Sequence, residues 1–313
     1  DKIKEAMSGI KNLRKYPDPA ATKLVEAIAS YHGFDKEEVF VGVGSDDVLA
    51  VAFMTFFNGK KPIFFPDITY SFYPVWAELF GIPYEKKAVN DAFEIQKEDY
   101  YAENGGVVFP NPNAPTGAFL SLEVVEDIIQ HNQDVVVIVD EAYIDFGGTS
   151  VLPLIDKYDN LIVVQTIVEV AVIDRNGPRG AIGNKELIKA MNDVKYSYNS
   201  YTMNEPSIVL GTAVLEDEEY FQETRNKIID TREWFQIEMR KIGFSFADSK
   251  ANFIFATHES VPAKEIFEAA KKAKIYVRYF DQPRINNYLR ITIGTRDEME
   301  TLLDFLKEFT ATK

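Results

Sequence analysis

Short runs of apolar residues alternate with helical patterns through the first half of the chain. Most runs are stretches of Val, Ile and Phe with turn residues at their ends. Such runs are typical of strands buried on both faces, as in a parallel sheet covered by helices. The runs lie at residues 39–43, 62–66, 107–110, 135–139 and 161–165, and helical patterns lie at 48–57, 71–80 and 122–131. This alternation predicts an α/β domain with a mainly parallel sheet.

The C-terminal third has a different pattern. A long, charged amphipathic stretch at residues 216–242 predicts one long helix. Further strands are expected at residues 244–246, 252–256, 276–279 and 288–293, and helices at 263–274 and 296–309. This order indicates a smaller α+β domain that follows the large one.

The composition narrows the classes of function. The length of 313 residues suits a large domain with a smaller one. A balance of 34 basic against 49 acidic residues gives a net charge of −15, which argues against binding to nucleic acid or to an anionic membrane. There is no cysteine, and the three histidines, His32, His131 and His258, are scattered. Disulfides and thiolate metal sites are excluded, and a histidine-based metal site or a serine–histidine hydrolase is disfavoured.

Targeting signals change this picture little. No apolar run approaches the roughly 20 residues of a membrane span, and no signal peptide is visible. We therefore expect a cytoplasmic protein without a membrane partner. The first residue is Asp1 rather than Met, so we expect further sequence before it.

Two loops after predicted strands carry candidate ligand-binding groups. Gly44-Ser45-Asp46 follows the run at 39–43 and begins a helix, where backbone N–H groups bind phosphate; an ordinary helix cap is the alternative. Asn113 lies in the string Asn-Pro-Asn-Ala-Pro-Thr-Gly at 111–117, which also follows a strand. Ligands bind at such carboxyl ends in α/β proteins, although a turn stiffened by two prolines is the alternative.

Two charged residues lie in apolar surroundings. Asp140 follows the run at 135–139 and needs a cationic partner, such as a protonated pyridine nitrogen, unless it caps the next turn. Arg290 lies inside the run at 288–293, where an arginine is costly unless a carboxylate meets it. That carboxylate belongs either to a substrate or to a structural ion pair.

Six motifs, in this order, resemble those of histidinol-phosphate aminotransferases, which are fold type I enzymes dependent on pyridoxal phosphate (PLP). They are Tyr-Pro-Asp-Pro at 16–19, Gly-Val-Gly-Ser-Asp at 42–46, Thr-Tyr-Ser-Phe-Tyr at 69–73, the string at 111–117, Asp-Glu-Ala-Tyr-Ile-Asp-Phe at 140–146, and Tyr-Leu-Arg-Ile-Thr-Ile-Gly-Thr at 288–295. The resemblance covers residues 13–309. It implies an N-terminal arm at 1–18, a large domain with a seven-stranded, mainly parallel sheet at 19–207, and a small domain at 208–313.

The resemblance also implies roles for single residues. Those at the cofactor would be Gly44, Ser45 and Asp46 at its phosphate, Tyr70 on its ring, Asn113 and Tyr143 at its phenolic oxygen, and Asp140 at its ring nitrogen. Tyr16 would reach the cofactor phosphate of the partner subunit in a homodimer. Arg290 would clamp a substrate carboxylate, with Arg278 and Asn199 on the substrate side. The implied reaction transfers the amino group of L-histidinol phosphate to 2-oxoglutarate by a ping-pong mechanism.

The resemblance breaks where the family carries its catalytic lysine. The family pattern is Thr-Phe-Ser-Lys, and this lysine forms a Schiff base with PLP and moves the substrate proton. Here residues 166–169 read Thr-Ile-Val-Glu, so Glu169 takes the place of the lysine. The same alignment places Gly177 at the family's phosphate-binding arginine, and no lysine lies between Lys157 and Lys185. A glutamate cannot form an imine.

Two explanations of this segment are open. The first is a compensated frameshift: codons read from the second base of Ile167 permit Ser-Lys-Ser-Arg-Ser-Leu over residues 168–173, which would place a lysine at position 169. True divergence to a lysine-free protein is the other. The function has two rivals as well: an aminotransferase for another substrate, such as an aromatic amino acid, and a non-catalytic protein of the same fold.

Overall fold

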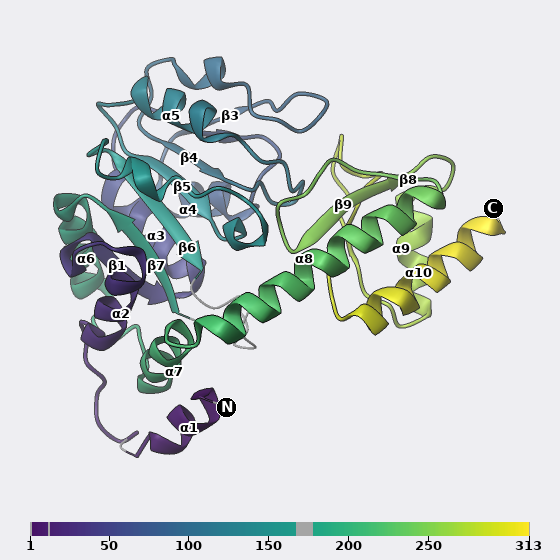
Figure 1. Ribbon diagram of the computed structural model, residues 1–313. Helices are drawn as coiled ribbons and strands as arrows, with labels where there is room; N and C mark the ends of the chain where they lie inside the picture. Colours follow the sequence, from purple (N-terminus) through teal and green to yellow (C-terminus); the bar gives the residue numbers. More distant parts are fainter. Residues whose placement is uncertain (1, 12, 167–177, 313) are drawn as a thin grey trace.

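Two sheets and the helices around them make up the molecule, and the long helix α8 (Glu218–Lys241) runs from one sheet to the other (Figure 1). The computed structural model describes residues 2–11, 13–166 and 178–312. The larger sheet has seven strands. Their order is β1 (Val39–Val43), β7 (Pro178–Gly183), β6 (Leu161–Thr166), β5 (Val137–Glu141), β4 (Val107–Pro110), β2 (Ile63–Pro66) and β3 (Tyr84–Lys87). Strand β7 is antiparallel to both of its neighbours, and the pairs from β6 to β3 are parallel.

Apolar residues on both faces explain why this sheet lies inside the large domain. In β5, Val137 and Val139 enter one core and Ile138 enters the other, because successive side chains of a strand point to opposite faces. The first core packs under α2 (Thr22–His32) and α5 (Leu122–Gln130). The second core packs under α3 (Gly44–Phe56), α4 (Phe72–Phe80) and α6 (Lys185–Tyr198). Unbroken apolar runs therefore gave the central strands, as expected.

The smaller sheet has four strands in the order β10 (Arg278–Tyr279), β11 (Leu289–Thr292), β9 (Phe253–His258) and β8 (Phe244–Ser245), all antiparallel. One face packs its aliphatic side chains, including Ile254, Leu289 and Ile291, into a core with α8, α9 (Ala263–Lys272) and α10 (Arg296–Ala311). The other face is different in chemistry, because it carries aromatic and arginine side chains. The predicted α+β region of the C-terminal third is confirmed.

Several elements were not predicted from the pattern. They are β3, β7, α1 (Lys2–Gly9), α2, α6, α7 (Glu205–Leu215) and the short 3-10 turns at Lys36–Glu38, Lys97–Tyr100, Ile144–Phe146 and Leu152–Leu154. Helix α7 packs against α1 and α2. The division at 19–207 and 208–313 stays a prediction, and its second boundary falls within α7. Within the described residues, no helix is both long enough and apolar enough to cross a membrane.

Candidate active site

The carboxyl ends of the strands bring the predicted residues together. Helix α3 begins at Gly44 directly after β1, Tyr70 follows β2, Asn113 follows β4, and Asp140 lies at the end of β5. Asp140 was expected at the end of the strand over residues 135–139, and it lies next to last in β5, which begins and ends two residues later than expected. This places the carboxylate on a fixed backbone rather than on a turn.

Asp140 is the centre of a buried polar cluster. Its side chain is only 5% exposed, and it accepts hydrogen bonds from the Tyr73 hydroxyl at 3.1 Å and from the Ala142 N–H at 3.2 Å. Burial and the nearby Asp140 charge raise the pKa of Tyr73 well above its usual value, so Tyr73 remains a donor. The charges of Asp140 and Tyr143 also act on the neighbouring Tyr70. Sequence reasoning singled out Tyr70 and Tyr143 but missed Tyr73, although it lies in the same motif.

Helix α3 starts without a side-chain cap. Val43 occupies the cap position and makes no side-chain hydrogen bond to the helix, so the reading of Gly44-Ser45-Asp46 as an ordinary cap is wrong. Asp46 instead accepts a hydrogen bond from the Tyr70 hydroxyl at 2.7 Å, and burial together with this carboxylate raises the Tyr70 pKa. Among the described residues, no side chain therefore accepts from the first-turn N–H groups, and such groups at a helix start favour an anion.

Three polar atoms at this edge are buried without a hydrogen-bond partner among the described residues. They are Thr69 Oγ1 after β2, Asn113 Oδ1 after β4, and Thr166 Oγ1 at the end of β6. Asn113 is otherwise fixed, since its Nδ2 donates to the Ile68 carbonyl at 3.0 Å and to Thr116 Oγ1 at 2.9 Å. Buried polar atoms in folded proteins nearly always have partners, so a group of orphans at one edge indicates a ligand position.

The smaller sheet contributes a pair of arginines. Arg278 of β10 and Arg290 of β11 are directly opposite each other in the antiparallel register. Arg290 lies over the Phe253 ring at 5.0 Å, and Phe253 in turn packs edge-on against Tyr143 at 5.0 Å, which connects this pair with the Asp140 cluster. In the described part of the chain neither arginine forms an ion pair, and Arg290 Nε is buried without a partner. A structural ion pair therefore does not account for Arg290.

Within the described residues, Tyr16 and Asn199 contact residues outside this cluster. Tyr16 is 81% exposed, and its ring contacts Tyr201 of the same chain at 4.7 Å. Asn199 ends α6, where its N–H donates to the Lys195 carbonyl at 2.7 Å. Glu169 and Gly177 lie outside the described residues, so the account of the missing lysine stays a prediction.

A second buried carboxylate, Glu141, lies beside Asp140 on the strand. Its oxygens accept hydrogen bonds from Ser150 Oγ at 2.6 Å, Gln165 Nε2 at 2.7 Å and the Val151 N–H at 2.7 Å. Burial nevertheless raises its pKa to about 7. Glu141 thus ties the end of β5 to the end of β6 and to the loop that contains Ser150. Among the described residues, no group of three or more His, Cys, Asp or Glu side chains is arranged to hold a metal ion.

The chain is similar to known aminotransferases over nearly its whole length. The family model described as "Aminotransferase class I and II" matches residues 1–306. The histidinol-phosphate aminotransferase of Lactococcus lactis subsp. cremoris (strain MG1363) is 49% identical over 302 residues, covering 96% of this chain and 85% of the relative. The enzyme of that name from Clostridium beijerinckii is 45% identical over 309 residues, covering 98% of this chain and 86% of the relative.

Solved structures show the same fold. The histidinol-phosphate aminotransferase of Clostridium acetobutylicum superposes with a TM-score of 0.90 at 22% identity, over 100% of this chain and 96% of the other. That of Sinorhizobium meliloti, solved in complex with pyridoxal-5'-phosphate, gives a TM-score of 0.87 at 20% identity, over 99% and 86%. By sequence family and by fold, this chain belongs to the class I and II aminotransferases, in the group of the histidinol-phosphate aminotransferases.

Proposed function

We propose that this chain transfers the amino group of L-histidinol phosphate to 2-oxoglutarate, as a step of histidine biosynthesis. The observation that carries the proposal is the arginine pair Arg278–Arg290, which lies across Phe253 and Tyr143 from the buried Asp140. The names of relatives at 45% to 49% identity support the choice of amino donor. We assign the arginine pair to an anion-binding side and the Asp140 cluster to a cofactor-binding side, which would be the two halves of such a site.

The anion-binding side follows from charge. Like charges directly opposite each other on neighbouring strands destabilise a sheet, and no carboxylate among the described residues forms an ion pair with either arginine. A bound phosphate or carboxylate offsets both charges, and the planar guanidinium of Arg290 suits two parallel hydrogen bonds to a carboxylate. Both proposed substrates carry such an anion.

The cofactor-binding side fits PLP. The uncapped first turn of α3 suits its phosphate, and Asp140 suits a protonated ring nitrogen, since Tyr73 and the Ala142 N–H hold that carboxylate in place. Tyr70 would lie on the ring, and Asn113 and Tyr143 at its phenolic oxygen. When bound, PLP supplies an electron-withdrawing ring that stabilises negative charge at the substrate's amino-bearing carbon. The role of Asp140 is to keep the proton on the ring nitrogen.

Position 169 decides whether the chain completes this chemistry. If Glu169 is present, no lysine moves the proton or attaches the cofactor, and PLP binds only through reversible contacts. Borohydride treatment with PLP should then add no cofactor mass to the chain. If the segment is a compensated frameshift, peptides across residues 166–181 should contain a lysine at position 169, and borohydride should fix one cofactor.

Glu169 is also the observation that favours a second candidate function, a non-catalytic protein that binds PLP weakly. Turnover with a panel of amino donors and 2-oxoglutarate separates the candidates. Histidinol phosphate should be the preferred donor, whereas preference for an aromatic amino acid would replace the proposed substrate. No turnover with any donor, together with Glu169 in the peptide map, would support the non-catalytic candidate.

We also propose that the protein is a cytoplasmic homodimer. Helix α4 presents the apolar side chains of Phe72, Val75 and Leu79 on one exposed stripe, at 42%, 47% and 72% exposure. Tyr16 is likewise exposed, as expected of a residue that reaches a partner subunit. Such a stripe favours association through a twofold axis. Sedimentation at micromolar concentration should show a dimer, and a clean monomer would overturn this part of the proposal.

A further inference from the structure

The arginine-bearing face of the smaller sheet contacts the large domain through aromatic rings. Tyr288 precedes Arg290 by two positions and Phe255 is opposite Arg290 in the register, so the three side chains share one face. The Phe255 and Tyr288 rings stack at 4.7 Å. Phe93 of the large domain packs edge-on against both rings, at 5.7 Å and 5.2 Å. Phe93 thus contacts Tyr288, two residues before Arg290, and Phe255, the residue opposite Arg290.

Arg284 makes a second bridge from the same end of the smaller sheet. Its Nη1 pairs with Asp67 Oδ2 at 2.9 Å, and its Nη2 donates to the carbonyls of Val89 at 2.6 Å and Asn90 at 3.1 Å. Asp67 follows β2, and its other oxygen accepts the Val89 N–H at 2.9 Å. One guanidinium therefore joins the loop after β2 to the turn that presents Phe93.

The backbone at both contacts is unusual. Phe93 has φ 64° and Arg284 has φ 70°, a left-handed conformation that few residues other than glycine adopt. Such conformations cost free energy and persist where the surroundings hold them, often near functional sites. Here the Phe93 turn is closed by hydrogen bonds from the Phe93 N–H to the Asn90 carbonyl at 3.0 Å and from the Asn90 N–H to the Glu94 carbonyl at 3.0 Å.

The Arg284 contact differs from an ordinary surface ion pair. Exposed pairs contribute little because water screens them and two flexible side chains must be ordered. Arg284 Nη2 donates to two backbone carbonyls, which have less conformational freedom than a side-chain carboxylate. The Arg284 side chain is 37% exposed. The contact therefore fixes a position rather than adding much stability.

We propose that Phe93 and Arg284 form a clasp between the two sheets that holds the Arg278–Arg290 pair at the correct distance from the Asp140 cluster. They are positioning residues for the substrate anion and do not touch it. The inference rests on the proposed function, because it assumes that the arginine pair binds a substrate anion. A displacement of about 1 Å is enough to spoil two-point binding by a guanidinium.

The test is calorimetric titration with 2-oxoglutarate of the full chain saturated with pyridoxamine phosphate, the cofactor form that accepts an oxo acid in a ping-pong reaction; PLP affinity is measured separately. Arg284→Gln should weaken 2-oxoglutarate binding about tenfold, the effect of losing about 1.4 kcal/mol, and Arg284→Lys should recover only part of it. Phe93→Leu changes the other half of the clasp and should act in the same direction. PLP affinity should be unchanged in all three variants, which a general loss of structure would not allow.

Arg296→Gln is the matched control, because Arg296 pairs with Glu300 and lies over Trp234 on the helical side of the smaller sheet. It should bind 2-oxoglutarate as the wild type does. Equal affinity of Arg284→Gln and the wild type would overturn the clasp, as would an equal loss of PLP affinity. Failure of the wild type itself to bind 2-oxoglutarate would instead overturn the proposed function.

Discussion

The polar side chains at the amino ends and at the carboxyl ends of the same parallel strands differ in how fully they are hydrogen-bonded. At the amino ends of β4, β5 and β6, three asparagines, Asn104, Asn132 and Asn160, precede the strands and are paired. Asn104 Nδ2 donates to Asn132 Oδ1 at 2.6 Å, and Asn132 Nδ2 donates to the carbonyls of Tyr100 at 3.0 Å and Ile128 at 2.8 Å. Asn160 Nδ2 donates to the carbonyls of Asn132 at 2.9 Å and Val135 at 3.1 Å.

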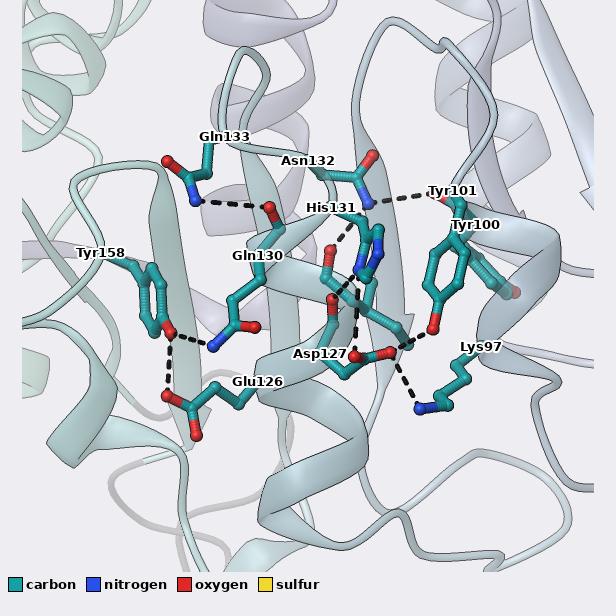
Figure 2. A network of polar contacts seen from close by, with 11 residues as sticks. Lys97, Tyr100, Tyr101, Glu126, Asp127, Gln130, His131, Asn132, Gln133 and Tyr158 are labelled. Carbon is teal, nitrogen blue, oxygen red and sulfur yellow. Dashed lines mark hydrogen bonds and ion pairs between the residues drawn. The ribbon is translucent and has the colours of Figure 1, made fainter.

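Other polar side chains around Asn132 are also paired, as Figure 2 shows. Asp127 pairs with Lys97 at 3.0 Å and accepts a hydrogen bond from Tyr101, whose ring stacks on His131. The Tyr100 hydroxyl is buried in this region without a hydrogen-bond partner among the described residues. The Tyr100 ring packs in the apolar core. These polar groups hold the 3-10 turn Lys97–Tyr100 against α5.

The carboxyl ends show the opposite. Thr69, Asn113 and Thr166 each keep a buried atom without a partner among the described residues, and Arg278 faces Arg290 without a carboxylate. Leaving a buried polar atom unpaired costs about 1–3 kcal/mol. The amino edge therefore pairs its asparagines for stability, whereas the carboxyl edge combines the paired Glu141 with several atoms that are unpaired among the described residues and available for a ligand.

The largest expected effect comes from breaking the paired edge. Asn132→Ala removes hydrogen bonds to two carbonyls and to Asn104, so the free energy of unfolding should fall by about 3 kcal/mol. Urea denaturation measures this change. Gln133→Ala is the control, because the exposed Gln133 makes one hydrogen bond, at 3.3 Å, to the Gln130 carbonyl. An equally small effect of both variants would contradict the structural role of the asparagines.

The sequence predicted the central strands and several site residues, but not the edge strands or the contacts between distant residues. The strands with unbroken apolar runs were predictable, whereas β3 (Tyr-Glu-Lys-Lys) is a charged edge strand and β7 (Pro-Arg-Gly-Ala-Ile-Gly) contains one proline and two glycines. Tyr70, Asn113 and Asp140 were found through motifs. The pairing of Arg278 with Arg290 depends on an antiparallel register, and the clasp of Arg284 with Asp67 joins residues 217 positions apart. Neither contact leaves a periodic signal in the sequence.

The pH dependence of stability distinguishes the buried carboxylate Glu141 from a surface one. The folded chain keeps the Glu141 proton up to a pKa of about 7, whereas an exposed glutamate loses it near 4.5. The free energy of unfolding should therefore fall as the pH rises through this window, by about 2–3 kcal/mol. Glu141→Gln should remove this slope. The exposed Glu186→Gln should keep it, and a wild-type stability that rises over the same range would contradict the assignment.

The substitution Arg290→Lys tests whether this arginine of the smaller sheet binds the substrate. Lysine keeps the charge but loses the two-point geometry, so the affinity for 2-oxoglutarate should fall by about 2 kcal/mol. The unfolding free energy should change little, because Arg290 holds no structural ion pair among the described residues. Unchanged affinity in a calorimetric titration would show that Arg290 does not meet the substrate.

The most direct measurement of the central claim is a calorimetric titration of the full chain with PLP, with pyridoxal as the comparison ligand. Reversible binding should occur, and pyridoxal should bind more weakly because it lacks the phosphate for the first turn of α3. Asn113→Ala should weaken PLP binding by about 1 kcal/mol, and the less stable Asn132→Ala should bind PLP as the wild type does. No binding of PLP, or equal losses in Asn113→Ala and Asn132→Ala, would contradict the account.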